Sequence, residues 1–355
     1  MEKKMAGSLK KGIRKNLFVI LTLLLSTGIL LYFLFTTDGI VALGEIILKL
    51  RPEWLFLSVA GAALCWISEG FVLNLLCVHL YPEWSFGRSF CVGMIGFLYS
   101  AVTPFSTGGQ PMQIYSMRKM GMDTGKAGSI IAVKTLTYQV VMVLYSLVLV
   151  AMKLHFFQTS VSNFSFVTII GLISNSTFIT LVALFMISET TTDKIVTGVI
   201  RFLHKVKLCR HPKERYDRIH NQLEIFHDAT KLMGRSIRLY VVVTAFTVVQ
   251  ITLNSLIPYL IYRSFNIGSA SVTTMVAAQV FVAMVSAFVP LPGASGGAEG
   301  SFYLFFGMFF KTAIIPAILL WRIITYYFNI LFGGVFAYVA QKRYHVQAPD
   351  ELEKR

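Results

Sequence analysis

The sequence predicts an all-α integral membrane protein, with about six full transmembrane helices and two re-entrant broken-helix hairpins in an inverted repeat. Of 355 residues, 55% are hydrophobic and 14% charged, and the mean hydropathy is +0.67, which is too apolar for a soluble domain of this size. Several apolar runs are long enough to cross about 30 Å of hydrocarbon as helices, and the alternation typical of strands is absent. Proline and glycine interrupt two further apolar stretches.

The predicted spans are six continuous apolar runs. They cover residues 17–35, 54–78, 127–152, 165–187, 239–262 and 313–340. The first run follows the basic segment "KKGIRKN", but it is too long for a signal-peptide core and no convincing small-residue cleavage site follows. We therefore expect it to be retained as the first helix.

The net charge of +15 has the distribution of a membrane protein and does not indicate a nucleic-acid partner. Lysine and arginine gather at the N-terminus, at 118–126, through 194–238 and at the C-terminus. This pattern follows the positive-inside rule and suits anionic lipid headgroups, so both termini are expected in the cytoplasm.

Cysteine, metal and catalytic motifs are not found. Cys65, Cys77 and Cys91 lie in or beside apolar helices and Cys209 lies in a basic loop, without CxxC spacing or a disulfide framework. No Walker loop, nucleophile elbow or HExxH motif occurs. We expect no catalytic residue, no metal and no cofactor, and no direct use of ATP by this chain.

The first interrupted stretch is "AVTPFSTGGQPMQIYSMRK", residues 101–119. If residues 87–117 crossed the membrane fully, Arg118, Lys119 and the basic 190–238 segment would all lie outside, against the positive-inside rule. A dip that returns to the cytoplasmic side keeps every basic segment inside. The charge pattern therefore favours a re-entrant hairpin.

The second interrupted stretch is "AFVPLPGASGGAEGSFYLFF", residues 287–306, and it leads into a final long helix that ends at "QKRYH". An offset of 188 residues aligns the helix breakers and the intramembrane cations of the two stretches. It places Pro104 on Pro292, Thr107 on Ser295, Gly108 and Gly109 on Gly296 and Gly297, Tyr115 on Tyr303, Lys134 on Arg322, Thr137 on Thr325, and Tyr138 on Tyr326. Shared composition alone does not supply this register, so an internal repeat is predicted.

Three full crossings separate the two dips, so the second hairpin must enter from the outer face. We expect one membrane domain over 1–345, with inverted halves at roughly 54–152 and 239–340, a cytoplasmic basic helical insert at 190–238 and a tail at 346–355. Inverted halves of this kind are typical of transporters that alternate access.

The backbone breaks form the first part of the predicted site. Breaks at bilayer depth free N–H and C=O groups, and they persist only where they line a wet cavity or are buried in protein. Short helices are expected to restart near Pro111 and near Glu299, with N-terminal N–H donors suited to an anion such as phosphate. Alternatively, the glycines merely allow close helix packing. The backbone candidates are Gly108, Gly109, Gln110, Gly296 and Gly297.

Two cations form the second part. Lys134 and Arg322 lie within apolar helices, where an unpaired charge costs at least about 2.5 to 3.5 kcal/mol. They either hold a lipid phosphate, with Arg322 making bidentate contacts, or form structural salt bridges, and Lys134 can also snorkel to the cytoplasmic surface. Tyr138 and Tyr326, four residues further along the same helix faces, either orient these cations or pack.

Two carboxylates, Glu69 and Glu299, complete the candidate site. Either one can pair with a cation, bind a cationic headgroup or carry a coupling proton, and a purely structural ion pair is the alternative. Five amide side chains either line the same cavity or make interhelical hydrogen bonds. They are Gln110, Gln139, Asn254, Gln279 and Asn329.

The basic segment 190–238 resembles a cytoplasmic helical hairpin, with Ile219, Leu223, Phe226 and Met233 at helical spacing. Its charges either contact anionic headgroups or act as a solvated determinant of topology.

The motifs "TPFSTGGQPMQIY" and "PLPGASGGAEGSFYLFF" resemble those of the flippase-like lysylphosphatidylglycerol synthase transmembrane region family, over residues 10–345. In bifunctional members the membrane region moves aminoacylated phosphatidylglycerol between leaflets, and a soluble C-terminal domain synthesises that lipid from aminoacyl-tRNA. The chain ends ten residues after "QKRYH", so the resemblance implies translocation and not synthesis. It applies most directly to Gly296, Gly297 and Glu299.

The leading hypothesis is therefore a translocase in the bacterial plasma membrane for anionic or aminoacylated phospholipid, such as lysylphosphatidylglycerol. The expected partners are the phospholipid headgroup and the membrane, and the protein acts either as a monomer or as a homodimer. A second hypothesis is the membrane part of a phosphatidylglycerol lysyltransferase that uses lysyl-tRNA. A third is a secondary transporter of a small solute or ion on the same scaffold, which fold alone does not exclude.

Overall fold

The computed structural model describes residues 28, 50–161, 164–205, 212–287 and 289–344. The predicted first helix over 17–35 and the tail over 346–355 lie outside the described residues. The elements in chain order are α3 (Pro52–Leu80), α4 (Phe86–Val102), α5 (Gly109–Lys119), α6 (Thr124–Ser160), α7 (Phe164–Ile187), α8 (Glu189–Lys205), α9 (Pro212–Gly234), α10 (Ile237–Ser264), α11 (Val272–Ser286), α12 (Gly297–Phe310), the 3₁₀ turn η1 (Lys311–Ala313), α13 (Ile314–Arg322), the π turn η2 (Ile323–Tyr327) and α14 (Phe328–Arg343).

The described chain is helical, as predicted, and contains no strand beyond one isolated bridge. Four segments are long and apolar enough to cross a membrane, namely α3, α6, α10 and the run from Gly297 to Arg343. A fifth is obtained if α7 and α8, bent by 99° at their junction, count as one span. The described residues thus support four or five spans where the sequence predicted six, since one predicted span falls outside them.

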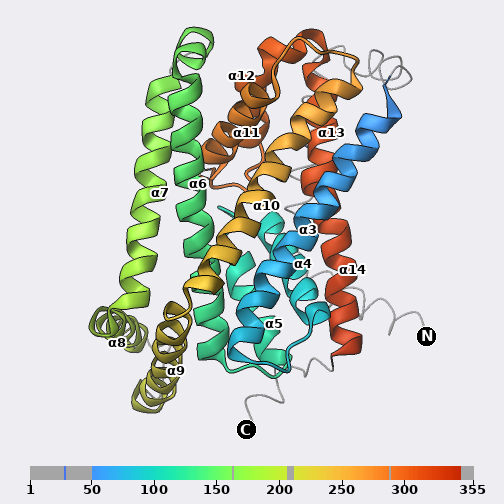
Figure 1. The fold of residues 1–355 in the computed structure, drawn as a ribbon. Helices are drawn as coiled ribbons and strands as arrows, with labels where there is room; N and C mark the ends of the chain where they lie inside the picture. The colour runs from blue at the N-terminus through green and yellow to red at the C-terminus, as the bar shows by residue number, and fades with distance from the viewer. Residues whose placement is uncertain (1–27, 29–49, 162–163, 206–211, 288, 345–355) are drawn as a thin grey trace, which may run out of the picture.

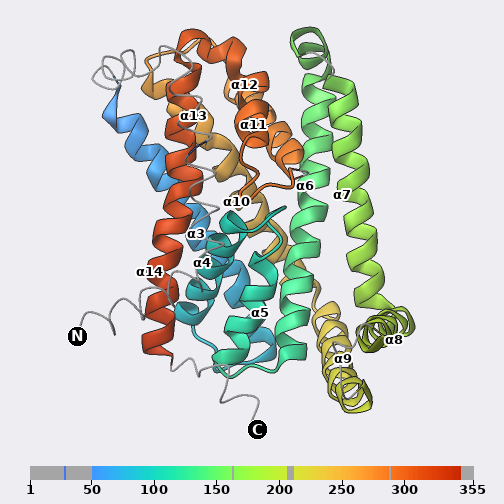
Figure 2. The ribbon, with the colours of Figure 1, turned by 180° about the vertical axis from the view of Figure 1, so that it is seen from behind.

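The helices surround a long central pair (Figures 1 and 2). Helices α3 and α10 pack along one another, and α14 lies against α4. Helices α4 and α5 lie in the lower half in Figure 1, and α11 and α12 lie in the upper half. Helices α6 and α7 form an antiparallel pair along one side, with α8 and α9 below them.

The two interrupted stretches meet in the middle of the molecule. Pro104, after α4, and Pro292, after α11, form an antiparallel bridge. Residues 105–106 have φ of 52° and 55°, and residues 293–294 have φ of 57° and 56°. The backbone turns at both places through the same left-handed conformation, 188 residues apart, and so reverses within a few residues.

The hydrogen bonds of the two turns also correspond. The Thr107 hydroxyl donates to Pro104 O at 3.0 Å, and the Ser295 hydroxyl donates to Pro292 O at 2.9 Å. Each turn leads into a helix that begins at the second glycine of its pair, Gly109 or Gly297, two residues earlier than predicted. These side-chain bonds satisfy backbone oxygens that a straight helix would otherwise pair, which makes the breaks tolerable away from water.

The described helices pack around two apolar clusters. In the cluster around α11, α12 and α13, the Phe302 and Phe306 rings stack at 4.3 Å between centroids, and Phe281 and Phe305 are fully enclosed. The cluster around α3, α4, α5 and α6 is centred on side chains such as Leu73. Many large apolar side chains on the long helices are exposed, as expected where lipid replaces water.

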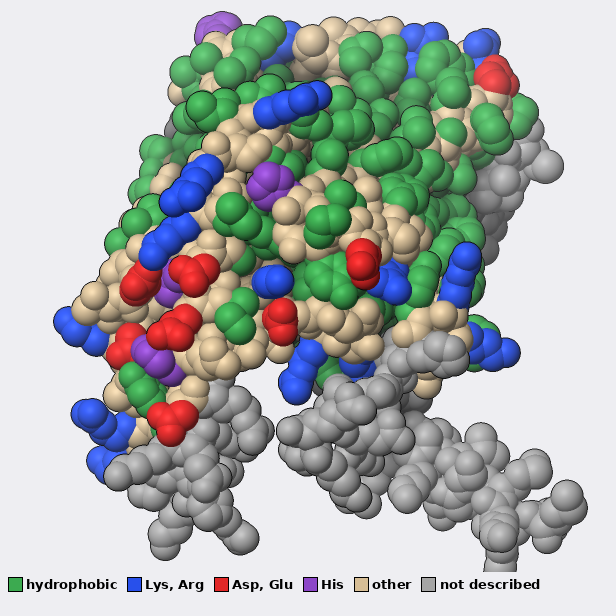
Figure 3. Space-filling model, turned by 60° about the horizontal axis from the view of Figure 1, so that its bottom comes forward, with side chains coloured by type: hydrophobic (Ala, Val, Ile, Leu, Met, Phe, Trp, Pro, Cys, Tyr) green, Lys and Arg blue, Asp and Glu red, His purple; other side chains and the backbone are tan. Residues whose placement is uncertain are grey.

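Charged side chains gather at one end of the molecule (Figure 3). This end carries the end of α5, the start of α6, α8, α9, the start of α10 and the end of α14. Exposed basic residues here include Arg118, Lys231, Arg235, Arg238, Lys342 and Arg343. The hairpin of α4 and α5 therefore starts and ends at the basic face.

Candidate functional site

A cavity of about 1560 Å³ lies between the α6–α7 pair and the two backbone breaks. Its walls include residues 105–107 of the first break, residues 293–294 of the second, and Phe226 of α9. The five amide side chains singled out in the sequence line this cavity. They are Gln110, Gln139, Asn254, Gln279 and Asn329. Elements distant in the sequence thus enclose one mixed polar and apolar chamber within the spanning helices.

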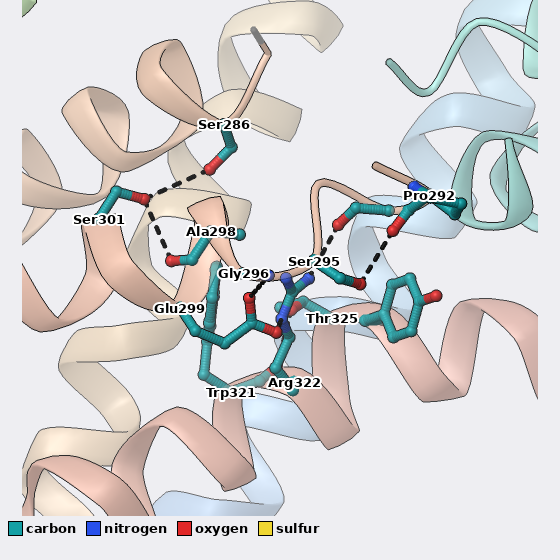
Figure 4. A network of polar contacts seen from close by, with 12 residues as sticks. Ser286, Pro292, Ser295, Gly296, Ala298, Glu299, Ser301, Trp321, Arg322 and Thr325 are labelled. Carbon is teal, nitrogen blue, oxygen red and sulfur yellow. Dashed lines mark hydrogen bonds and ion pairs between the residues drawn. The ribbon is translucent and has the colours of Figure 1, made fainter. Parts of the chain in front are cut away.

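Arg322 and Glu299 form a buried ion pair at the wall of this cavity (Figure 4). Arg322 Nε donates to Glu299 Oε1 at 2.7 Å, and Arg322 Nη1 donates to Gly293 O at 3.2 Å. The two residues are only 4% and 1% exposed. The rings of Trp321 and Tyr326 lie 5.2 Å and 5.1 Å from the guanidinium carbon. These contacts hold the guanidinium in one orientation.

Glu299 also caps the helix on which it lies. Its Oε2 accepts a hydrogen bond from the backbone N–H of Gly296 at 2.6 Å, so the carboxylate closes the start of α12. At α5 the Gly108 N–H donates to Thr103 Oγ1 at 2.8 Å. These two donors were expected to be open to an anion, and the structure corrects this, because side chains of the protein already occupy them.

Lys134 and Glu69 form a second ion pair within the spanning helices. Lys134 Nζ also donates to Gln113 Oε1 at 3.0 Å. The amides of Gln113 and Gln250 each donate to a Glu69 carboxylate oxygen at 3.2 Å. This network joins α3, α5, α6 and α10 at one carboxylate, so of the alternatives for Lys134 the structure has the ion pair and not a side chain that snorkels to the surface.

A smaller cavity of about 370 Å³ borders the Lys134–Glu69 network. It shares several wall residues with the large cavity, among them Tyr138, Gln139, Asn254 and Asn329. Trp66 donates to Asn329 Oδ1 at 2.7 Å, which fixes that amide at the shared wall. The two ion pairs therefore lie beside two adjoining chambers.

Some of the remaining predicted residues allow helices and loops to pack closely, and others line the cavities. A Cβ at Gly109 would lie 2.1 Å from Ser100 Oγ, and a Cβ at Gly297 would lie 2.1 Å from Val289, so both glycines allow close packing. Tyr326 donates from its hydroxyl to Ala101 O at 3.3 Å, across to the other half. Tyr138 lines both chambers.

Sequence reasoning missed three polar partners, Thr103, Gln113 and Gln250. All three are polar residues within apolar stretches, which is the signal that could have identified them. Their roles depend on which helices approach each other, and spacing along one helix does not reveal that. No group of three metal-ligating side chains occurs among the residues that the structure describes.

Long apolar helices, two chain breaks that meet midway and enclosed ion pairs define a multi-pass helical membrane protein with an internal cavity of mixed polar and apolar lining. The chain belongs to the lysylphosphatidylglycerol synthase TM region family, which it matches over residues 19–333. It is also similar to a UPF0104 membrane protein of Archaeoglobus fulgidus. The two are 27% identical over 302 residues, which cover 80% of this chain and 86% of that protein.

Proposed function

We propose that this protein is a lipid translocase, which moves the headgroup of a phospholipid through its central cavity from one leaflet to the other. The halves at 54–152 and 239–340 act in this proposal as an inverted repeat, with the basic face and both termini on the cytoplasmic side of a bacterial plasma membrane. Supporting it are the 188-residue correspondence of the two turns and the placement of their hairpins in opposite halves of the molecule.

The observation that carries the proposal is the chamber where the two breaks meet, because it combines polar groups with an apolar wall. A headgroup needs hydrogen-bonding partners to leave water, and acyl chains need a continuous apolar path. The wall formed by Phe178, Leu181 and Phe185 of α7 offers such a path beside the polar lining. Rocking of one half against the other would then change the face to which the chamber opens.

Arg322 is the proposed contact for the lipid phosphate, and Glu299 holds it in place. Gly108, Gly109, Gln110, Gly296, Gly297, Tyr138 and Tyr326 shape the chamber in this proposal. Lys134 and Glu69 act in the adjoining chamber, where the pair is the candidate for coupling lipid movement to an ion or proton. A fixed arginine suits phosphate because its donors are already oriented.

The test is a proteoliposome assay that follows fluorescent phospholipid between leaflets. We expect the wild-type protein to accelerate the exchange, and we expect Arg322→Ala and Glu299→Ala to remove most of the acceleration. Lys231→Gln is the matched control, because Lys231 also pairs with a glutamate but does so at the surface. Exchange at the wild-type rate in both cavity variants would reject the proposal.

The name of the matched family supports a second candidate, the membrane part of a phosphatidylglycerol lysyltransferase. The purified protein would then form aminoacylated lipid from lysyl-tRNA and phosphatidylglycerol, alone or with a partner. Detection of that product by mass spectrometry in a reaction with this chain alone would favour synthesis over translocation.

A further inference from the structure

We propose that the cavity selects a zwitterionic headgroup, with one phosphate and one ammonium and no net charge; this rests on the proposed lipid translocation. The charges around the two chambers and the unpaired polar atoms in their walls point to it independently of each other.

Among the residues that the structure describes, the charged side chains in the walls of the two cavities balance once Glu299, which pairs with Arg322, is counted. Arg322 is paired with Glu299, and Lys134 is paired with Glu69. The other charged residues that line the large cavity are Arg118 and Asp123, again one of each sign. An ion in a low-dielectric interior needs a countercharge, and here each buried cation already has one. A headgroup with net charge would therefore enter without compensation, whereas a zwitterion brings its own.

The wall also contains an unpaired donor beside the neutral ion pair. Arg322 uses Nε and Nη1 in hydrogen bonds, but its Nη2 is buried and has no hydrogen-bond partner. Buried polar atoms of this kind are rare, and an arginine nitrogen can only donate. The two free oxygens of a phosphodiester carry no proton, so they act only as hydrogen-bond acceptors and complement Nη2.

A second residue that lines the same cavity contains an unpaired acceptor. Gln279 on α11 is 6% exposed, and its Oε1 is buried without a hydrogen-bond partner. An ammonium group donates and cannot accept, so it complements this oxygen. An amide attracts an ammonium without adding a negative charge, which keeps the chamber neutral. Phosphatidylethanolamine has both required groups and no net charge, as does phosphatidylglycerol esterified with an amino acid whose side chain is neutral, whereas phosphatidylglycerol itself lacks the ammonium.

The experiment compares natural headgroups on phospholipids labelled in the acyl chain, in proteoliposomes of the full-length protein. We expect phosphatidylethanolamine to exchange at least about tenfold faster than phosphatidylglycerol. The net negative headgroup of phosphatidylglycerol has no free countercharge in the chamber. Equal or faster exchange of phosphatidylglycerol overturns the inference but leaves the proposed translocation intact. If no phospholipid exchanges faster than in empty vesicles, translocation itself fails.

Two substitutions at one position test the role of Gln279. Gln279→Leu removes the acceptor for the ammonium. The exchange rate of phosphatidylethanolamine should therefore fall to about the rate of phosphatidylglycerol, which has no ammonium. Gln279→Glu adds a negative charge and should shift the preference towards lysylphosphatidylglycerol, which has a net positive charge. An unchanged ratio of the two lipids in Gln279→Leu, in protein that keeps its melting temperature, overturns the assignment.

A soluble phosphoamine has the same charged groups as the lipid headgroup. Release of entrapped glycerophosphoethanolamine from the same vesicles distinguishes the two sources. Retention of the soluble compound while labelled phosphatidylethanolamine exchanges assigns the site to a lipid. Release of the soluble compound without lipid exchange overturns the lipid assignment.

Discussion

Lys134 and Arg322 occupy matching positions 188 residues apart, yet they take their counterions from different elements. Lys134 pairs with Glu69 of the long helix α3, whereas Arg322 pairs with Glu299 of the short helix α12. The same offset places Ile257 opposite Glu69 and Pro111 opposite Glu299. The two matching positions therefore both have a cation, but different elements supply its countercharge, so the two pairs need not have the same role.

The Glu299–Arg322 pair should dominate local stability. In Glu299→Gln the charge of Arg322 loses its countercharge in a buried place, so we expect a loss of about 3 to 5 kcal/mol in unfolding free energy. Unfolding in detergent followed by circular dichroism measures it. Glu189→Gln is the control, because that carboxylate forms its ion pair with Lys231 on the exposed surface and its loss should have little effect.

Replacing both partners separates stability from function. Glu299→Leu combined with Arg322→Met removes both buried charges, so most of the stability lost in Glu299→Gln should return. Lipid exchange in proteoliposomes should stay low, because no donor remains for a phosphate. Recovery of exchange in the double variant would contradict the role proposed for Arg322.

The Lys134–Glu69 network should respond unequally to loss of its two ends. Lys134→Met leaves Glu69 with hydrogen bonds from two amides. Glu69→Leu instead removes the acceptor of the Gln113 and Gln250 amides and the countercharge of Lys134, which keeps only its hydrogen bond to Gln113 Oε1. We expect Glu69→Leu to lower the unfolding free energy by about 1 to 3 kcal/mol more than Lys134→Met, since unsatisfied buried groups add their own cost. Equal losses would show that the amides contribute nothing.

Helix α9 packs closely against α6 at Gly125, and alanine substitutions at Gly125 and at the nearby Gly128 test how tight this contact is. A Cβ at Gly125 would lie 2.4 Å from Gln222 O, whereas a Cβ at Gly128 would lie 3.4 Å from Phe226. Gly125→Ala should cost about 1 to 3 kcal/mol by overpacking. Gly128→Ala, at a place with room, should be neutral or slightly stabilising because alanine favours helix. Melting temperatures of the two variants test this difference.

The sequence alone was enough to predict the helical class and the two interrupted stretches. Periodicity and hydropathy act within one helix, and the breakers Pro104 and Pro292 are visible there. The prediction could not say which carboxylate meets which cation, because that depends on the packing of α3 against α6 and of α12 against α13. The same limit hid Gln113 and Gln250.

The expectation of open helix N-termini was wrong at Gly108 and Gly296 for a related reason. A glycine-rich break shows that donors are freed but not what accepts from them. In α12 the acceptor is Glu299, which follows Gly296 by three residues, the spacing of a capping box. That spacing is visible in the sequence, and the structure shows that Glu299 both accepts from the Gly296 N–H and pairs with Arg322.

The inverted arrangement that we propose for residues 54–152 and 239–340 makes a prediction about the two faces of the membrane. Asp123 follows the first hairpin and Thr312 follows the second, and both are exposed. The start of α6, which Asp123 precedes, and the turn between α12 and α13, which contains Thr312, lie at opposite ends of the molecule (Figure 1). Because each hairpin should return to the face it came from, cysteines placed at these positions should react with an impermeant maleimide from opposite sides of sealed vesicles.

The native cysteines Cys65, Cys77 and Cys91 are buried and should not react with the maleimide, so only Cys209 needs to be replaced for this experiment. Asp123→Cys should be labelled in inside-out vesicles and Thr312→Cys in right-side-out vesicles, with labelling of both after detergent as the control. Labelling of both positions from one side would mean that one stretch crosses the membrane completely. The hairpins would then no longer mirror each other, and a rocking motion about the bridge between Pro104 and Pro292 would lose its structural basis.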